Sequence, residues 1–189
     1  MISGRVIITQ ETTETMPNAP THDFITLVSV AAADVAYFHY APQPQPLLAV
    51  LFTGAYVFAG YACAGDLDLK STEYNRWGPL KFLWLPYRWL VPHRSWVSHG
   101  LLLGGIIRAL YLGVLSALVL LSGYWIYGRL FPLATPVDPL DETRNHLMNF
   151  FAFTKDHPRE SIALFSGFVL AGTAHSTADT ISTWFKRRF

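Results

Sequence analysis

Two long stretches of the chain contain no charged side chain, and they restrict what this sequence can fold into. The first runs from Leu47 to Gly65 and the second from Ala109 to Gly128. Each is close to the roughly 20 apolar residues that an α-helix needs to cross the hydrocarbon core of a bilayer. We therefore predict that both stretches are transmembrane helices.

The composition of the whole chain favours a membrane protein over other classes. Of its 189 residues, 51% are hydrophobic and 14% are charged, and the formal net charge is +1. Soluble domains carry about 25% charged residues, and nucleic-acid binding needs a basic surface. We expect membrane lipids as partners and no nucleic acid. The single cysteine, Cys63, excludes an internal disulfide and a cysteine-based zinc cluster.

Two shorter apolar segments complete an all-α prediction. Residues 25–40 and 161–174 are mostly apolar, and the prolines of residues 41–46 form a turn that no helix crosses. We predict a polytopic membrane helical bundle of about four transmembrane helices plus an interfacial segment. Residues 21–185 would form this single domain.

The remaining segments flank or connect the predicted spans. Residues 1–20 are expected to be a flexible tail, with Met16 as an alternative translation start, and residues 186–189 a basic C-terminal tail. Residues 66–98 are expected to lie at headgroup level, with Trp84, Tyr87 and Trp89 as interfacial anchors. The prolines of residues 128–158 predict an irregular external loop there, with a short helix around residues 142–153.

Four spans would bring most metal-binding side chains to one membrane face. The predicted ligands on that face are His22, Asp66, Asp68, His93, His99, His175 and Asp179. Most lysines and arginines outside the spans fall on the same face, so the positive-inside tendency predicts that it is cytoplasmic. The membrane would be a bacterial cytoplasmic or thylakoid membrane.

Sequence spacing predicts that some of these side chains point to the same side of the backbone. An extended backbone at GDLDL would aim Asp66 and Asp68 the same way, although a solvated turn is the alternative. His175 and Asp179, at i and i+4, share one helix face and could grip one metal; a helix-end hydrogen bond is the alternative. Asp23 is interpreted as a cap of the first helix rather than as a ligand.

The ligand set of four imidazoles and three carboxylates fits zinc, with manganese or iron as alternatives. Seven donors exceed one tetrahedral site, so we expect one or two ions. Two ions sharing a carboxylate would activate water for hydrolysis. Arg94, between His93 and His99, could orient a substrate phosphate with its fork of donors or bind lipid headgroups.

The order of several motifs resembles a known family. THD, DLDLKS, RWGPL, WLPY and PHRSWVSHG follow one another between Thr21 and Leu112. The series resembles uncharacterised metal-binding membrane proteins that are common in cyanobacteria. It is more distantly similar to the YdjM-like, LexA-regulated inner-membrane proteins described as metal-dependent hydrolases. The resemblance implies metal binding and, by analogy alone, hydrolase activity.

Three functions agree with these patterns, so the sequence leaves open whether the protein is an enzyme. The first is a metal-dependent hydrolase that acts on a phosphoester or acyl group of a lipid or lipid-linked substrate. The second is a non-catalytic metal-binding membrane protein with a structural, assembly or sensing role. A metal transporter ranks last, because its ligands should lie near the bilayer midplane.

Two charged residues, Asp34 and Arg108, lie within the apolar segments. A charge at bilayer depth costs on the order of 2.5–3.5 kcal/mol, so each should have a partner. Their predicted depths differ by only about 5 Å, and we predict that they form an ion pair. The alternative is that Arg108 reaches a phosphate beneath the metal.

Overall fold

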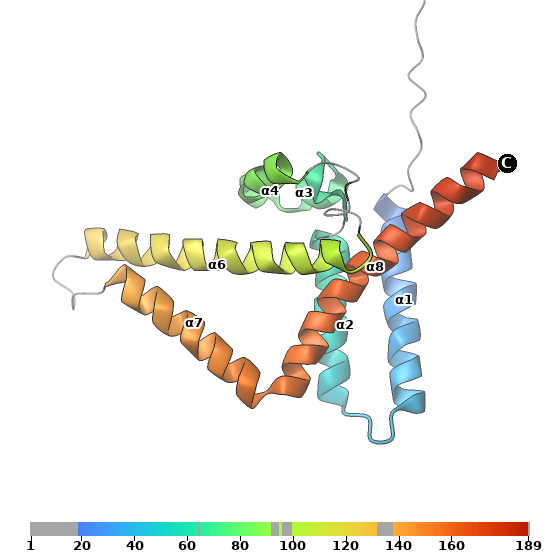
Figure 1. Ribbon diagram of the computed structural model, residues 1–189, viewed down its shortest axis with the longest axis horizontal. Coiled ribbons are helices and arrows are strands. Elements are labelled where there is room, and N and C mark those ends of the chain that lie inside the picture. Colours follow the sequence, from blue (N-terminus) through green and yellow to red (C-terminus); the bar gives the residue numbers. More distant parts are fainter. Residues whose placement is uncertain (1–18, 64, 92–94, 96–99, 132–137, 189) are drawn as a thin grey trace, which may run out of the picture.

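The proline-rich turn at residues 41–45 joins two antiparallel helices, α1 (Ala19–Tyr40) and α2 (Pro46–Ala62), as predicted (Figure 1). Pro46 occupies the first turn of α2, where its missing N–H costs no hydrogen bond. The Tyr37 hydroxyl accepts a hydrogen bond of 2.8 Å from the backbone N–H of Gln45 and ties the end of α1 to the turn.

The computed structural model describes residues 19–63, 65–91, 95, 100–131 and 138–188. Within these ranges all regular structure is helical and no strand occurs, so the all-α prediction is confirmed. Four short helices follow α2 in the chain. They are η1 (Gly65–Asp68), α3 (Thr72–Arg76), η2 (Gly78–Trp84) and α4 (Leu85–Leu90).

The short helices enclose an aromatic core, which corrects the prediction of interfacial anchors. Trp84 and Tyr87 are 0% and 1% exposed, and each ring lies 5.3 Å from the ring of Tyr111, between centroids. Tyr111 belongs to α6 (Leu103–Leu130), so this core fastens the short helices to the start of α6. Only Trp89, at 81% exposure, has the accessibility expected of an anchor.

The α6 helix is the one described helix that is long and apolar enough to cross a membrane. Its 28 residues span about 42 Å at 1.5 Å per residue. The α2 helix is apolar but has 17 residues, because the chain turns into η1 after it. Figure 1 shows that the axis of α6 runs crosswise to those of α1 and α2, and that α6 extends away from these two helices. By helix length and apolar composition, the described residues therefore do not reproduce the four predicted transmembrane helices.

The segment predicted as an irregular loop contains a full helix, α7 (Pro139–Asp156). The Asp138 side chain caps its start by accepting a hydrogen bond of 2.8 Å from the N–H of Leu140. Pro139 fits the first turn, and the acidic residues of that turn complement the helix dipole. The predicted short helix at residues 142–153 is the middle of this longer element.

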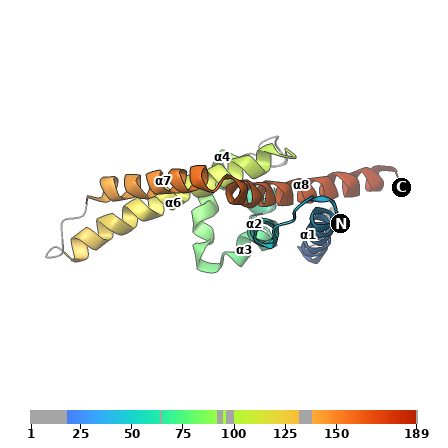
Figure 2. The same cartoon turned by 90° about the horizontal axis from the view of Figure 1, so that it is seen from below.

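The last helix, α8 (Pro158–Arg188), is continuous over 31 residues. The predicted span at residues 161–174 is its first half, and the helix continues through the expected basic tail as far as Arg188. In both views α8 crosses α2 and then α1 (Figures 1 and 2). Its second half therefore lies against the start of α1.

The predicted ion pair between Asp34 and Arg108 is wrong. Asp34 accepts a hydrogen bond of 2.6 Å from the Thr53 hydroxyl, between α1 and α2. Arg108 is 2% exposed, and its charge interacts with Tyr87 and Asp68. The prediction compared depths in parallel helices, whereas the axis of α6 runs crosswise to that of α1 and leads away from it (Figure 1).

Candidate metal centre

Three predicted ligands converge where the start of α1 meets the second half of α8. The Nε2 atom of His22 lies 3.3 Å from one carboxylate oxygen of Asp179, and the Nε2 atom of His175 lies 3.3 Å from the other. Ligand atoms of all three residues lie within 4.8 Å of one another. One carboxylate therefore faces two imidazoles from opposite ends of the chain.

Local helix geometry explains half of this arrangement. His175 and Asp179 are four residues apart in α8, so they share one face of that helix, as their spacing predicts. His22 belongs to the second turn of α1 and reaches the same place only because the two helices cross. The crossing therefore completes the group.

The two imidazole rings are stacked. The ring centroids of His22 and His175 are 4.0 Å apart and the ring planes differ by 25°. The two residues are 3% and 4% exposed, whereas the Asp179 side chain is 22% exposed. The group is thus closed on its imidazole side and open to solvent on its carboxylate side.

The donor set fits a zinc ion. Two nitrogen atoms and one oxygen atom are common zinc ligands, at about 2.0–2.2 Å from the metal. Two atoms bound to one tetrahedral zinc lie roughly 3.3–3.4 Å apart by that geometry, close to the 3.3 Å between each imidazole nitrogen and the carboxylate. The same distances also suit direct contacts between the imidazoles and the carboxylate, which include the helix-end hydrogen bond given above as the alternative for His175 and Asp179.

Asp68 does not join this group. Its residue is 6% exposed and its charge interacts with Arg108 and Tyr87. The backbone of η1 is a 3-10 helix rather than extended, so the reason for expecting two parallel carboxylates at Asp66 and Asp68 was wrong. The Asp66 side chain lies outside the part of the structure that is described.

Three more predicted site residues, His93, Arg94 and His99, also lie outside the described residues. Their roles as ligands or as a substrate contact stay predictions. The three histidines outside the predicted ligand set, His39, His146 and His157, are exposed. His146 shares a hydrogen bond of 2.6 Å with the Tyr124 hydroxyl.

Arg108 of α6 lies against α8 beside Gly172, which is close in sequence to the predicted ligands of α8. A Cβ atom at Gly172 would overlap its guanidinium group, so the arginine occupies the space that a side chain would fill. Gly172 precedes His175 by three residues, roughly 4.5 Å along the helix. Arg108 therefore places a buried positive charge against α8 about one turn before His175.

Sequence reasoning missed the partner of Asp23. This residue lies inside α1 and does not cap it. Arg76 of α3 donates two parallel hydrogen bonds to the carboxylate, of 2.9 Å to Oδ1 and 2.5 Å to Oδ2. Both residues belong to motifs noted above, THD and RWGPL, but the order of the motifs does not reveal the pairing.

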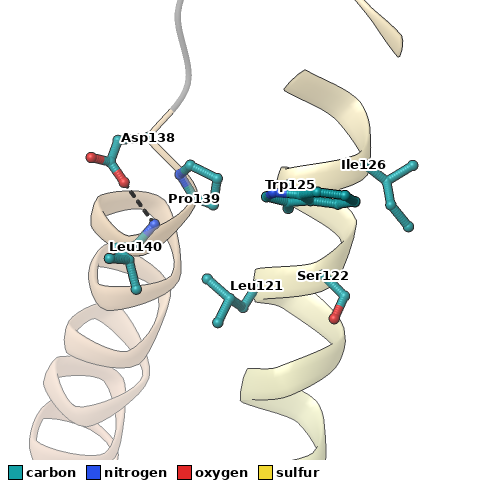
Figure 3. Close-up of a pocket in the computed structure, with 7 residues that line it drawn as sticks. All are labelled: Leu121, Ser122, Trp125, Ile126, Asp138, Pro139 and Leu140. Atoms are coloured by element: carbon teal, nitrogen blue, oxygen red, sulfur yellow. Dashed lines mark hydrogen bonds between the residues drawn. The ribbon is translucent and has the colours of Figure 1, made fainter. Parts of the chain in front are cut away.

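A pocket elsewhere in the molecule has little metal-binding chemistry. It lies between α6 and the start of α7 and is lined mainly by apolar side chains such as Leu121, Trp125 and Ile126 (Figure 3). Its one carboxylate, Asp138, already accepts the capping hydrogen bonds of α7. The convergent group at α1 and α8 is therefore the stronger candidate site.

Comparison with known families supports metal binding by this chain. Residues 17–189 match the family described as uncharacterized metal-binding protein (DUF2227). The chain belongs to this family. The match confirms the metal-binding family predicted from the motifs and extends it to the C-terminus. It carries no information on YdjM-like proteins or on cyanobacteria. No curated protein and no solved structure matches the chain.

Proposed function

We propose that the protein binds a divalent metal ion, with zinc the first choice and manganese or iron as alternatives. The proposal rests on the convergence of His22, His175 and Asp179, whose ligand atoms lie within 4.8 Å of one another. The two histidines would bind through Nε2 and Asp179 through a carboxylate oxygen. Soft thiolate ligands are absent from this group, which agrees with a borderline metal such as zinc.

Further ligands would come from the segments that adjoin this group in the predicted topology. Asp66, His93 and His99 are the candidates for a further ligand of this ion, and together with Asp68 they would hold a second ion. This part of the proposal rests on sequence alone.

We also propose that the metal site hydrolyses a phosphoester or acyl group. Three protein ligands with an open position are typical of catalytic zinc, whereas structural zinc has four. A bound ion supplies Lewis-acid polarisation of the scissile group and makes water more acidic. Asp179 has two carboxylate oxygens and is the most exposed of the three residues. Its second oxygen can accept a hydrogen bond from the reacting water.

The substrate is proposed to be a lipid or a lipid-linked molecule, because α6 has the features of a membrane anchor. Only 17% of its most apolar window is buried, whereas a core helix of a soluble protein would be mostly buried. Leu110, Val114 and Leu118 are all more than half exposed. The excess of basic residues near the ligands supports a cytoplasmic orientation, and Arg94 would bind the anionic part of the substrate.

A second candidate function is a structural metal site. Its three ligands come from α1 and α8, which are the first and last described helices, and one ion would tie the ends of the chain together. In that case His93 or His99 would fill the fourth position and leave none for substrate. The protein would then serve assembly or sensing.

Hydrolysis assays on the metal-loaded protein separate the two functions. We would purify the full chain in detergent, load it with zinc, and measure hydrolysis of bis-p-nitrophenyl phosphate, p-nitrophenyl acetate and mixed phospholipid vesicles. Zinc-dependent turnover that is lost in His175→Ala and kept in His146→Ala supports the hydrolase. Stoichiometric zinc with no turnover on any substrate class contradicts it and favours the structural site.

A further inference from the structure

The carboxyl end of α2 is held by two side chains from the RWGPL motif. The last carbonyl groups of a helix have no partner within it. Arg76 donates a hydrogen bond of 2.9 Å to the carbonyl oxygen of Tyr61, and the Trp77 indole donates one of 2.7 Å to that of Ala62. A guanidinium group at this end also complements the helix dipole.

The same arginine binds α1 beside a predicted metal ligand. Its fork of donors engages both oxygens of Asp23, the residue after His22. This bidentate geometry fixes orientation more strictly than a single hydrogen bond does. Only 28% of the Arg76 side chain and 22% of the Asp23 side chain are exposed, so the pair is partly shielded from water.

Packing below the ion pair brings the two helices into close contact. A Cβ atom at Gly60 of α2 would overlap the side chain of Thr26, so α1 and α2 approach closely there. Thr26 lies one turn after His22 in α1. The start of α1 is therefore held at two positions along the helix, at Asp23 by Arg76 and one turn later at Thr26 by the contact with Gly60.

Neighbouring residues of a helix point about 100° apart, because there are 3.6 residues per turn. Asp23 faces α3, while His22 faces α8 and Asp179. The ion pair consequently sets the rotation of α1 about its own axis. A rotation that broke the pair would turn the His22 imidazole away from His175.

We propose that Arg76 is a positioning residue for the metal site, which acts by holding Asp23 and the end of α2 so that His22 meets α8. This inference rests on the metal site proposed above. It assigns a role in metal binding to a residue that does not touch the ligand group. It also joins the THD and RWGPL motifs through one contact, between Asp23 and Arg76.

The test is cobalt binding by the full chain in detergent, followed by the visible absorption of the bound ion. Arg76→Ala and Asp23→Asn should each weaken cobalt affinity by about tenfold or more, the loss expected when an orienting partner is removed. The absorption spectrum should change, because one ligand is misplaced. The double variant should bind no more weakly than Arg76→Ala, because both changes break one interaction.

Arg129→Ala is the matched control. Its guanidinium lies 5.1 Å from the Trp125 ring centroid, as that of Arg76 lies 5.0 Å from the Tyr61 ring centroid. Arg129 belongs to the last turn of α6, and that end of α6 lies away from the crossing of α1 and α8 (Figure 1). This control should bind cobalt like the natural protein. If Arg76→Ala does not fold, Arg76→Lys keeps the charge without the fork and should still weaken binding.

Two other results overturn the inference in different ways. Cobalt affinity within twofold of the natural protein in Asp23→Asn and Arg76→Lys, with a lowered melting temperature, would show that the pair only supports the fold. Absence of cobalt binding by the natural protein would refute the metal site itself.

Discussion

His22 and His175 stack their imidazole rings at a centroid distance of 4.0 Å, although they belong to the first and last described helices. Both rings are buried, and the Asp179 carboxylate lies 3.3 Å from each Nε2 atom. A divalent cation bound between them would be held by two neutral imidazoles and one carboxylate.

Gly172→Ala should destabilise the protein. Its methyl group would overlap the guanidinium group of Arg108, a residue that is only 2% exposed. Overpacking of this kind costs about 1–3 kcal/mol of the free energy of unfolding. Thermal or chemical unfolding in detergent measures the change.

Gly113→Ala provides the matched control, since nothing lies within 4 Å of the added methyl group. Alanine is the better helix former by about 1 kcal/mol, so this variant should be as stable as the natural protein or more so. Equal stability of Gly172→Ala and Gly113→Ala would contradict the placement of Arg108 against α8.

Two tryptophans of the short helices should respond in opposite ways to truncation. Trp84→Ala removes a side chain of 0% exposure and should cost about 3–5 kcal/mol of the free energy of unfolding. Trp89→Ala removes one of 81% exposure and should change it by less than about 0.5 kcal/mol. The same unfolding measurements check both variants. A change of less than about 0.5 kcal/mol for Trp84→Ala would contradict the buried position of Trp84 and favour the interfacial one predicted from sequence.

The single thiol of the protein should be protected from reagents. Cys63 is 1% exposed and packs within the aromatic core of the short helices. Maleimide labelling of the native protein should therefore be at least about tenfold slower than labelling in denaturant, because it requires local opening. Mass spectrometry of timed samples gives both rates. Labelling at the same rate in the two states would mean that this core is open.

Sequence patterns predicted the elements that depend on local chemistry. The proline turn after Tyr40 and the shared face of His175 and Asp179 follow from chain stiffness and helical periodicity. The start of α7 also carried a readable signal, because Asp138 precedes Pro139 as a cap precedes a first turn. The proline content of the surrounding segment outweighed that signal in the prediction.

Features that depend on helix crossing could not be read from the sequence. A capping rule assigns Asp23 to the nearest backbone N–H groups, but Arg76, 53 residues later, binds it in the folded chain. Composition also cannot distinguish a buried tryptophan from an interfacial one, since both offer an apolar ring with a polar atom. The position of His22 against α8 belongs to the same class of feature.

The metal content of the purified full chain tests the central claim most directly. Inductively coupled plasma mass spectrometry on protein grown with zinc, manganese and iron should find one or two divalent ions per chain, zinc first. His175→Ala and His22→Ala should each lose metal, because a ligand of the convergent group is gone. The exposed His146→Ala should retain it. Equal metal content in all three variants, or none in the natural protein, would contradict the site.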